Sequence, residues 1–453
     1  IKGNTKIINS FIVHFSKVLN LIINTTFAAM QNKQAITLLF IANIISGFAQ
    51  GISMIAIPWY FVKIVERPEM FASAYIGITF LTLFWGLYAG TLIDRYSRKK
   101  LFIIINIVCG FCIGGIALYG FYMAHLADFL VILVFGITIF NYNVHYPNLY
   151  AFGQEITEPK NYGKLNSYIE VQGQTTSVLA GAFAALLLTG IHNNMLEIAG
   201  FSIHVPFNIK AWNIYEVFLM DAITYIVVIF IFLLIKYKPI VKEEVHKGNL
   251  FSRLKGGVLY LKDHPIIFMF GFLSYMLFAF TLVEVHVLLP SYVHRFLEMD
   301  GNIYASAEIY YSLGAICSGV LVLRIFRKLN TVASIIILLV SVSFAFCAMA
   351  AYKLLWVFFL GNLMLGIANA GVRILRTTYI FNHIPNNLIG RAGSVFNSLN
   401  IIIRMMMIGV FALPFFHLND NIRYGYFVGA GLMFLTLIPL LFWYKRIISV
   451  EKN

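Results

Sequence analysis

The chain has 453 residues, of which 60% are hydrophobic and 11% are charged, and its formal net charge is +14. A soluble chain of this length would carry roughly a quarter charged residues, so the composition excludes an ordinary soluble globular protein. Uncharged windows of the length needed to cross a bilayer as a helix recur along the chain. The sequence therefore predicts an all-α integral membrane protein.

Twelve such windows follow one another in chain order. Nine contain no formal charge: residues 36–62, 70–93, 101–124, 129–154, 171–191, 266–283, 329–352, 354–372 and 424–444. Three more carry one central charge each: 217–235 with Asp221, 303–323 with Glu308, and 392–416 with Arg404. We expect twelve transmembrane helices, six on either side of a long basic segment.

The basic residues indicate an orientation. If the N-terminus is cytoplasmic, the inner segments hold 24 Lys and Arg and the outer segments hold 6. An excess of Lys and Arg on the cytoplasmic side is the usual rule for membrane proteins. The charge of +14 is thus explained by contact with anionic lipids on the cytoplasmic side, and no nucleic-acid partner is expected.

Four segments divide the chain. Residues 1–29 contain no Met but carry an apolar stripe at helical spacing, and are either an amphipathic interfacial helix or a non-native extension. Residues 30–236 form a first six-helix bundle, and 265–453 form a second. Between them, 237–264 is a cytoplasmic linker, in which Leu250, Leu254, Val258 and Leu261 predict an interfacial helix.

The two bundles share sequence features at nearly one offset. Pro58 and Pro290 are 232 residues apart, near the ends of helices one and seven. Gly163 and Gly393, which open helices five and eleven, are 230 residues apart. An internal repeat of this kind is typical of secondary transporters, whose substrate site lies between the repeats.

The segment from Gly90 to Lys99, GTLIDRYSRK, resembles the helix 2–3 loop signature of the major facilitator superfamily, G-x-L-x-D-R-x-G-R-K, with Ser97 in place of the usual glycine. Tyr146-Pro147 and the segment 163–167 resemble the macrolide-efflux and enterobactin-exporter branch. The Gly-Pro motif of drug exporters is missing from helix five, where residues 179–183 read LAGAF. The resemblance implies two pseudo-symmetric six-helix bundles and transport by alternating access.

The resemblance also implies a conformational latch. In the family, the acid of this loop meets the start of helix eleven, here residues 390–394, whose free N–H groups attract negative charge. Gly86 and Gly90 are expected to allow a close helix neighbour, as are Gly110 and Gly114. The expected latch residues are Gly90, Asp94, Arg95, Arg98, Lys99, Gly390 and Arg391.

In this fold, helices one, four, seven and ten line the central cavity. Their polar residues, together with Arg404 on helix eleven, are the candidates for contact with substrate: Asn43, Gln50, Asn141, His145, His286, Asn369, Arg373, Arg376 and Arg404. A charge inside the membrane is costly, so such residues usually face protein or water. Arg376 is close enough to the inner end of its helix to extend to the membrane surface.

Three acids are candidates for proton coupling: Glu284, Asp221 and Glu170. Glu284 is either the protonation site or one member of an ion pair with an arginine. Asp221, Glu170 and Glu308 lie within two turns of helix starts, where interfacial or capping roles are the alternative.

The expected function is proton-coupled efflux of a small amphipathic molecule, drug-like or siderophore-like. The alternatives are a lysolipid or lipid flippase and a carboxylate importer, and a non-transporting receptor is the remotest. The motifs H-E-x-x-H, G-x-x-x-x-G-K-[ST] and G-x-S-x-G do not occur, so no enzyme, no ATP-driven pump, no metal and no cofactor is expected. We expect a monomer in the bacterial cytoplasmic membrane, with both termini cytoplasmic.

Overall fold

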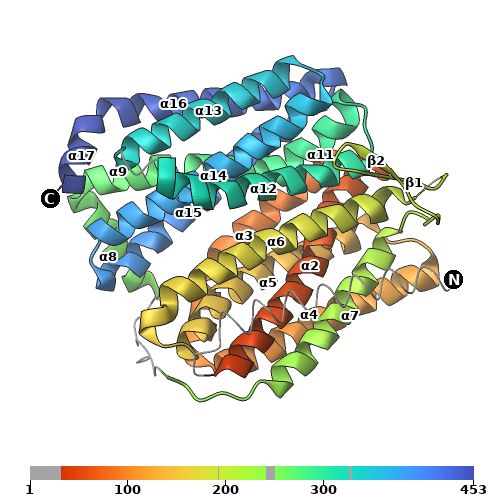
Figure 1. Ribbon diagram of the computed structural model, residues 1–453, viewed down its shortest axis with the longest axis horizontal. Coiled ribbons are helices and arrows are strands. Elements are labelled where there is room, and N and C mark those ends of the chain that lie inside the picture. Colours follow the sequence, from red (N-terminus) through yellow and green to blue (C-terminus); the bar gives the residue numbers. More distant parts are fainter. Residues whose placement is uncertain (1–31, 192, 241–249, 326–328, 453) are drawn as a thin grey trace.

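The computed structural model describes residues 32–191, 193–240, 250–325 and 329–452. Within these ranges the chain is almost entirely helical, and eleven helices are long and apolar enough to cross a membrane. The predicted segment 1–29 lies outside the described residues. Figure 1 shows the helices side by side in two groups, with α2 to α7 in one and α9 to α16 in the other.

The first half contains six long helices and a small sheet: α2 (Lys33–Lys63), α3 (Pro68–Arg95), α4 (Arg98–Met123), α5 (Asp128–Glu155), η1 (Pro159–Asn161), α6 (Tyr162–Thr189), β1 (Met195–Ile198), β2 (Phe201–His204) and α7 (Ile214–Leu234). The linker forms α8 (Leu250–Asp263). The Leu250 and Leu254 side chains lie outside the described residues, whereas Leu261 is buried and Val258 is exposed.

The second half begins with a segmented helix made of α9 (Pro265–Ser274), α10 (Met276–Val283), the π-turn η2 (Glu284–Leu288), α11 (Leu289–Ser291) and the π-turn η3 (Tyr292–Phe296). It continues with α12 (Gly301–Ile325), α13 (Thr331–Ala351), α14 (Leu355–His383), α15 (Asn386–Phe411), η5 (Pro414–His417), η6 (Asn419–Arg423), α16 (Tyr424–Phe442) and α17 (Tyr444–Lys452).

The predicted fold class is confirmed, because each of the twelve predicted windows coincides with a helix. Eleven of them meet the length and apolarity expected of a membrane span in the described residues. The twelfth, 303–323, lies in α12, which packs between α6 and α14. Glu308 lies inside this helix and does not interrupt it.

The expected start of helix eleven is wrong by one turn. The structure begins α15 at Asn386, and the amides of Leu388 and Ile389 already bond to the Pro385 carbonyl. Gly390 therefore lies beyond the first four residues, where a helix has its free N–H groups. Any anion attracted by this helix end would meet residues 386–389 instead.

The glycines of helices two and three differ in what they contact. A Cβ on Gly110 would lie 3.0 Å from the Tyr225 Cβ, and one on Gly114 would lie 3.4 Å from the Ala222 Cβ. These two glycines therefore bring α4 and α7 close together, as predicted. The prediction is not met at Gly90, because a Cβ there would have no atom of the described residues within 4 Å.

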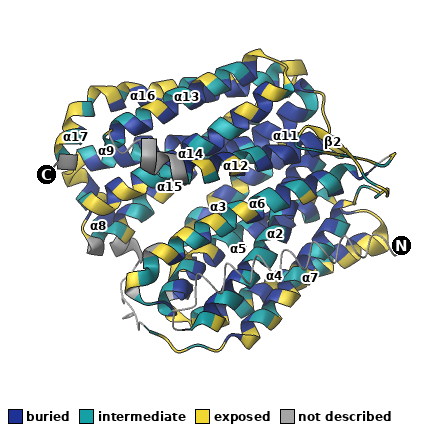
Figure 2. Cartoon of the chain, in the orientation of Figure 1, coloured by how far each residue is buried: buried dark blue, intermediate teal, exposed yellow. Residues whose placement is uncertain are grey.

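The molecule has two distinct ends. We call the end that carries β1 and β2 the hairpin end, and the end that carries α8 and α17 the linker end (Figure 1). At the hairpin end the halves meet through Trp59, whose ring stacks on Tyr304 at 5.5 Å, and through a 3.4 Å ion pair between Lys63 and Asp300. Figure 2 shows buried residues gathered around α11 and α12 at this end.

The hairpin was missed in the sequence, and it joins the two halves. Its two-residue turn, Ala199-Gly200, has positive φ at both positions, as a tight hairpin turn requires. The Ala199 N–H donates to the Ser306 hydroxyl at 2.9 Å, and the Ala199 carbonyl accepts from Tyr310 at 3.0 Å. A Cβ on Gly200 would clash with the Phe359 ring. The tip of the first half is thus held by α12 and α14 of the second.

Candidate functional site

The polar residues predicted on helices one and four face each other inside the first half. His145 on α5 contacts the Asn43 Oδ1 on α2 at 2.8 Å, and the Asn43 amide donates to Gln172 on α6 at 2.7 Å. All of Asn43, His145 and the neighbouring Ser46 are buried. These amides and the imidazole therefore connect three helices, α2, α5 and α6.

A second polar group lies further along α2. The Asn141 amide is 3.4 Å from both the Gln50 Oε1 and the Tyr225 hydroxyl. One turn closer to the hairpin end, Ser53 donates to the Asp221 Oδ2 at 3.2 Å. Asp221 is fully buried on α7, so it is not the interfacial or capping residue that its position near a helix start suggested.

Glu284 is buried in the second half at the start of the first π-turn. Tyr426 on α16 donates to its Oε1 at 2.7 Å, and among the described residues its Oε2 has no hydrogen-bond partner. Pro290 cannot donate a backbone hydrogen bond, and the two π-turns flank it. No described arginine or lysine pairs with Glu284, so the alternative of a structural ion pair is not what this conformation shows.

His286 lies two residues further on and faces the opposite half. Its ring meets those of Tyr75 at 5.7 Å and Phe135 at 5.6 Å, both edge to face. Arg404 on α15 lies beside the Tyr75 hydroxyl. The π-turn therefore places an acid inside one half and an imidazole at the contact between the halves.

An ion pair joins the halves closer to the linker end. The Arg373 Nη2 on α14 is 2.8 Å from the Glu170 Oε2 on α6, and Tyr150 donates to the other oxygen of Glu170 at 2.9 Å. Glu170 is eight residues from the start of α6 and Arg373 ten from the end of α14, which is about 12 and 15 Å along a helix. The side chains are still 45% and 40% exposed. Charges at that depth are found facing water or protein rather than lipid, so the pair faces a water-accessible space.

The two remaining candidates for substrate contact on α14, Arg376 and Asn369, already bind other groups of the protein. Arg376 donates to the Ser274 carbonyl at 3.0 Å and lies 3.6 Å above the Tyr275 ring. It is only 4% exposed, so the expectation that it extends to the membrane surface is wrong. Asn369 donates to the Tyr311 hydroxyl at 2.7 Å.

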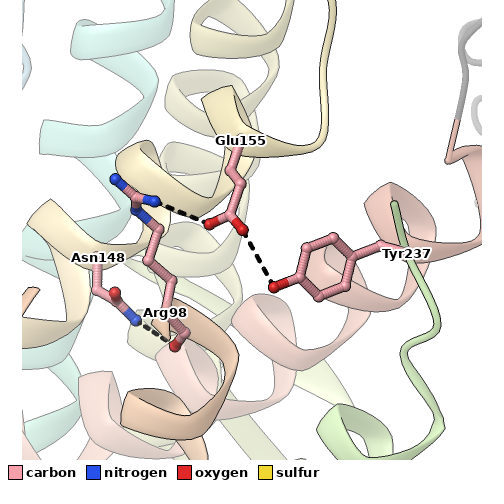
Figure 3. Close-up of polar contacts among 4 residues, drawn as sticks. All are labelled: Arg98, Asn148, Glu155 and Tyr237. Atoms are coloured by element: carbon pink, nitrogen blue, oxygen red, sulfur yellow. Dashed lines mark hydrogen bonds and ion pairs between the residues drawn. The ribbon is translucent and has the colours of Figure 1, made fainter. Parts of the chain in front are cut away.

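The charged loop between α3 and α4 is built into the base of the first half (Figure 3). The Arg98 Nη1 is 2.9 Å from the Glu155 Oε2, and Tyr237 donates to the other oxygen of Glu155 at 3.1 Å. Asn148 donates to the Arg98 carbonyl at 3.0 Å. Burial, and then the negative charge of Glu155, raise the pKa of Tyr237, so its hydroxyl remains a donor. The loop thus ties α4 to α5 and to the segment that follows α7.

The other residues of the predicted latch differ in what their side chains contact. Lys99 donates to the Ile235 carbonyl at 2.8 Å, whereas Arg95 is exposed above the Tyr96 ring. Gly257 of α8 lies so close to the Arg391 carbonyl that a Cβ there would clash. The Asp94 side chain lies outside the described residues, so its contact with helix eleven stays a prediction.

Sequence reasoning missed the partners of these groups. Ser53, Tyr426 and Gln172 each bond to a predicted residue, yet an isolated polar residue on an apolar helix gives no sign of what it faces. The Glu155 contact could have been predicted. Glu155 is an acid at the inner end of its helix, and the neighbouring loop on the same side of the membrane carries four basic residues.

A cavity of about 750 Å³ opens at the hairpin end. Aromatic rings of Trp59, Tyr60, Trp212 and Tyr215 line it, together with Glu197 of the hairpin and residues 300–302 of the second half.

A family model described as Major Facilitator Superfamily matches residues 39–407. Solved structures with the same fold include the nucleoside transporter NupG, which is 14% identical with a TM-score of 0.66 over 91% of this chain and 99% of that chain. A bacterial homologue of the iron transporter ferroportin, in an inward-facing state, is 15% identical with a TM-score of 0.65 over 90% and 98%. The xylose transporter XylE from E. coli, in an inward-open conformation, is 11% identical with a TM-score of 0.63 over 90% and 95%. No curated protein matches the chain.

Proposed function

The chain belongs to the major facilitator superfamily, and on that basis we propose that it is a secondary active transporter that exports a small amphipathic molecule in exchange for protons. Membership and fold indicate a transporter rather than an enzyme. The direction, the substrate class and the coupling ion are the proposal.

The observation that carries proton coupling is Glu284. A fully buried carboxylate without a basic partner is strongly disfavoured as a charge, so it has a reason to hold a proton when it is enclosed. It lies on a π-turn, a backbone irregularity that is frequent at functional sites. His286 on the same turn contacts Tyr75 and Phe135 of the other half. A movement of one half against the other would therefore displace this turn and change the surroundings of Glu284.

The contacts between the halves support alternating access. The Trp59 ring stack, the Lys63–Asp300 pair and the hairpin all join the halves at the hairpin end. The Glu170–Arg373 pair, in contrast, is nearly half exposed deep within its helices. We therefore interpret this conformation as closed at the hairpin end and open to water toward the linker end.

The test is transport by the purified protein in proteoliposomes, after a library screen for compounds against which it protects an efflux-deficient host. We expect Glu284→Gln to abolish transport driven by a pH gradient and to leave substrate exchange largely intact. Glutamine keeps the bond from Tyr426 but cannot release a proton. Unchanged uphill transport in Glu284→Gln would remove Glu284 from the mechanism.

Glu298→Gln is a matched control, because it makes the same chemical change in an exposed residue that pairs with Lys353. It should transport as the unmodified protein does. A loss of both uphill transport and exchange in Glu284→Gln, with this control active, would mean that Glu284 is structural.

The alternatives gain no specific support from the geometry. A carboxylate importer would need free arginines, but Arg373 is paired with Glu170 and Arg376 is buried on Tyr275. Within the proposal, the protein acts as a monomer in the bacterial cytoplasmic membrane. Its linker end and both termini would be cytoplasmic, facing anionic lipids.

A further inference from the structure

A group of buried oxygens in the first half has no role in the transport mechanism proposed above. It consists of Asp221 and Tyr225 on α7, Gln50 and Ser53 on α2, and Asn141 on α5, all buried. Asp221 and Tyr225 are four residues apart and Gln50 and Ser53 three, so each pair is separated by about one helical turn, 5.4 Å. Ser53 bonds to Asp221, and Asn141 contacts both Gln50 and Tyr225. The five side chains therefore occupy two adjacent turns at the meeting point of three helices.

This group has more acceptors than donors. Among the described residues, neither the Asp221 Oδ1 nor the Asn141 Oδ1 has a hydrogen-bond partner, although both atoms are buried. No described lysine or arginine forms an ion pair with Asp221. Buried polar atoms normally have partners, and a buried charge normally has a counter-charge. These oxygens lack a positively charged partner that could bind several of them at once.

We propose that Asp221, Ser53, Gln50, Asn141 and Tyr225 form a binding site for a single Na⁺ ion within the first half. Carboxylate, amide carbonyl and hydroxyl oxygens are the ligands that hard cations prefer. A proton on Asp221 would neutralise one atom only, whereas a metal cation can draw on oxygens from all three helices.

The charge of the site selects a monovalent ion. Asp221 is its only acid, so one positive charge makes the buried group neutral. A divalent ion would leave an uncompensated positive charge in the membrane interior, which is costly. Sites for divalent or transition metals use more acidic, His or Cys ligands, and no cluster of three such residues occurs in the described part of the chain.

A row of polar side chains on α2 extends from the site toward the linker end. Asn43, Ser46, Gln50 and Ser53 recur every three or four residues along α2, so they lie on one face of the helix. Their exposed fractions fall along the helix from 7% at Asn43 through 2% and 1% to 0% at Ser53. Gln172, which bonds to Asn43, is only half-buried. An ion entering at Asn43 would meet an oxygen at each turn down to Asp221.

The experiment measures binding of ²²Na⁺ to the purified full-length protein in detergent, at fixed pH, with choline chloride keeping the ionic strength constant. It requires no substrate and no transport, so its result is independent of the proposed function. We expect saturable binding of one ion per chain, which unlabelled Na⁺ displaces and choline does not. Absence of saturable binding, or displacement by choline, would overturn the proposal.

Variants locate the ion. Asp221→Asn should abolish binding, and Ser53→Ala should weaken it by at least about 10-fold, because it removes one ligand oxygen and even the loss of a partner outside the ligand set costs about 10- to 100-fold. Glu298→Gln is the control, because it neutralises an exposed acid that pairs with Lys353, outside both buried sites, and should bind Na⁺ normally. Normal binding by Asp221→Asn would refute the site. Parallel loss in Glu298→Gln would also refute it, because binding would then depend on acidic charge in general. If Asp221→Asn fails to fold, the affinity of Ser53→Ala decides, and an unchanged affinity refutes the site.

Discussion

The pair formed by Arg98 and Glu155 should stabilise the first half far more than the other charges of its loop. The two side chains are only 15% and 13% exposed and their nearest atoms are 2.9 Å apart. A hydrogen bond between charged groups contributes about 1.5–3 kcal/mol when it is shielded from water. Glu155→Gln keeps an oxygen for Tyr237 but removes the negative charge that Glu155 places beside the guanidinium. We therefore expect the free energy of unfolding to fall by about 1.5–3 kcal/mol, a 10- to 150-fold change in the ratio of folded to unfolded protein.

The assay is unfolding in mixed detergent micelles, followed by tryptophan fluorescence, for Arg98→Gln, Glu155→Gln and the double variant. Because the pair acts as a unit, the double variant should lose less than the sum of the single losses, with a coupling of at least about 1 kcal/mol. Arg95→Gln is the control. Arg95 is exposed and, among the described side chains, lies beside the Tyr96 ring, so its loss should stay below about 0.5 kcal/mol. A coupling near zero, or an equal loss in Arg95→Gln, would show that Arg98 is a topological charge like its neighbours.

Two further predictions concern movements at the two ends, and both are read as alkylation rates of single cysteines in a background without the four native ones. At the hairpin end, Ser306→Ala removes the acceptor for the Ala199 N–H, a bond of about 0.5–1.5 kcal/mol, so alkylation of Ala305→Cys should rise about 2- to 12-fold. An unchanged rate would mean that the hairpin rests on the second half without holding it. At the linker end, Asp94→Asn should slow transport and raise alkylation of Ser394→Cys by about 2- to 30-fold, because a charge at a helix N-terminus contributes roughly 0.3–2 kcal/mol. Equal rates with normal transport would make Asp94 a plain loop charge.

The membrane helices could be predicted because their cause is local. A run of about 20 uncharged residues has to be a helix in a bilayer, so the predicted window 70–93 lies within two residues of each end of α3. Helix eleven was predicted to start at residues 390–394, whereas α15 begins at Asn386. In the structure Arg391 is inside α15 and packs on Gly257 of α8, a contact that no local pattern reveals.

The partners of the polar residues could not be predicted, because they depend on how helices rotate against one another. Asn43 and His145 were expected on a common cavity, and they bond to each other within one half. Glu284 and His286 are two residues apart, yet one lies inside the second half and the other faces the first. The hairpin escaped notice because its two strands have four residues each and their only turn signal is Ala199-Gly200.

The position of that hairpin bears on the face of the membrane from which an inhibitor could act. The hairpin contributes Met195 and Glu197 to the wall of the 750 Å³ cavity, whose other walls come from both halves. Volumes of this size hold drug-like molecules. A compound lodged there would touch both halves at once and oppose their separation, without passing through the membrane or competing for the substrate route. Inhibition of this kind would be non-competitive and would act from one face of the membrane only.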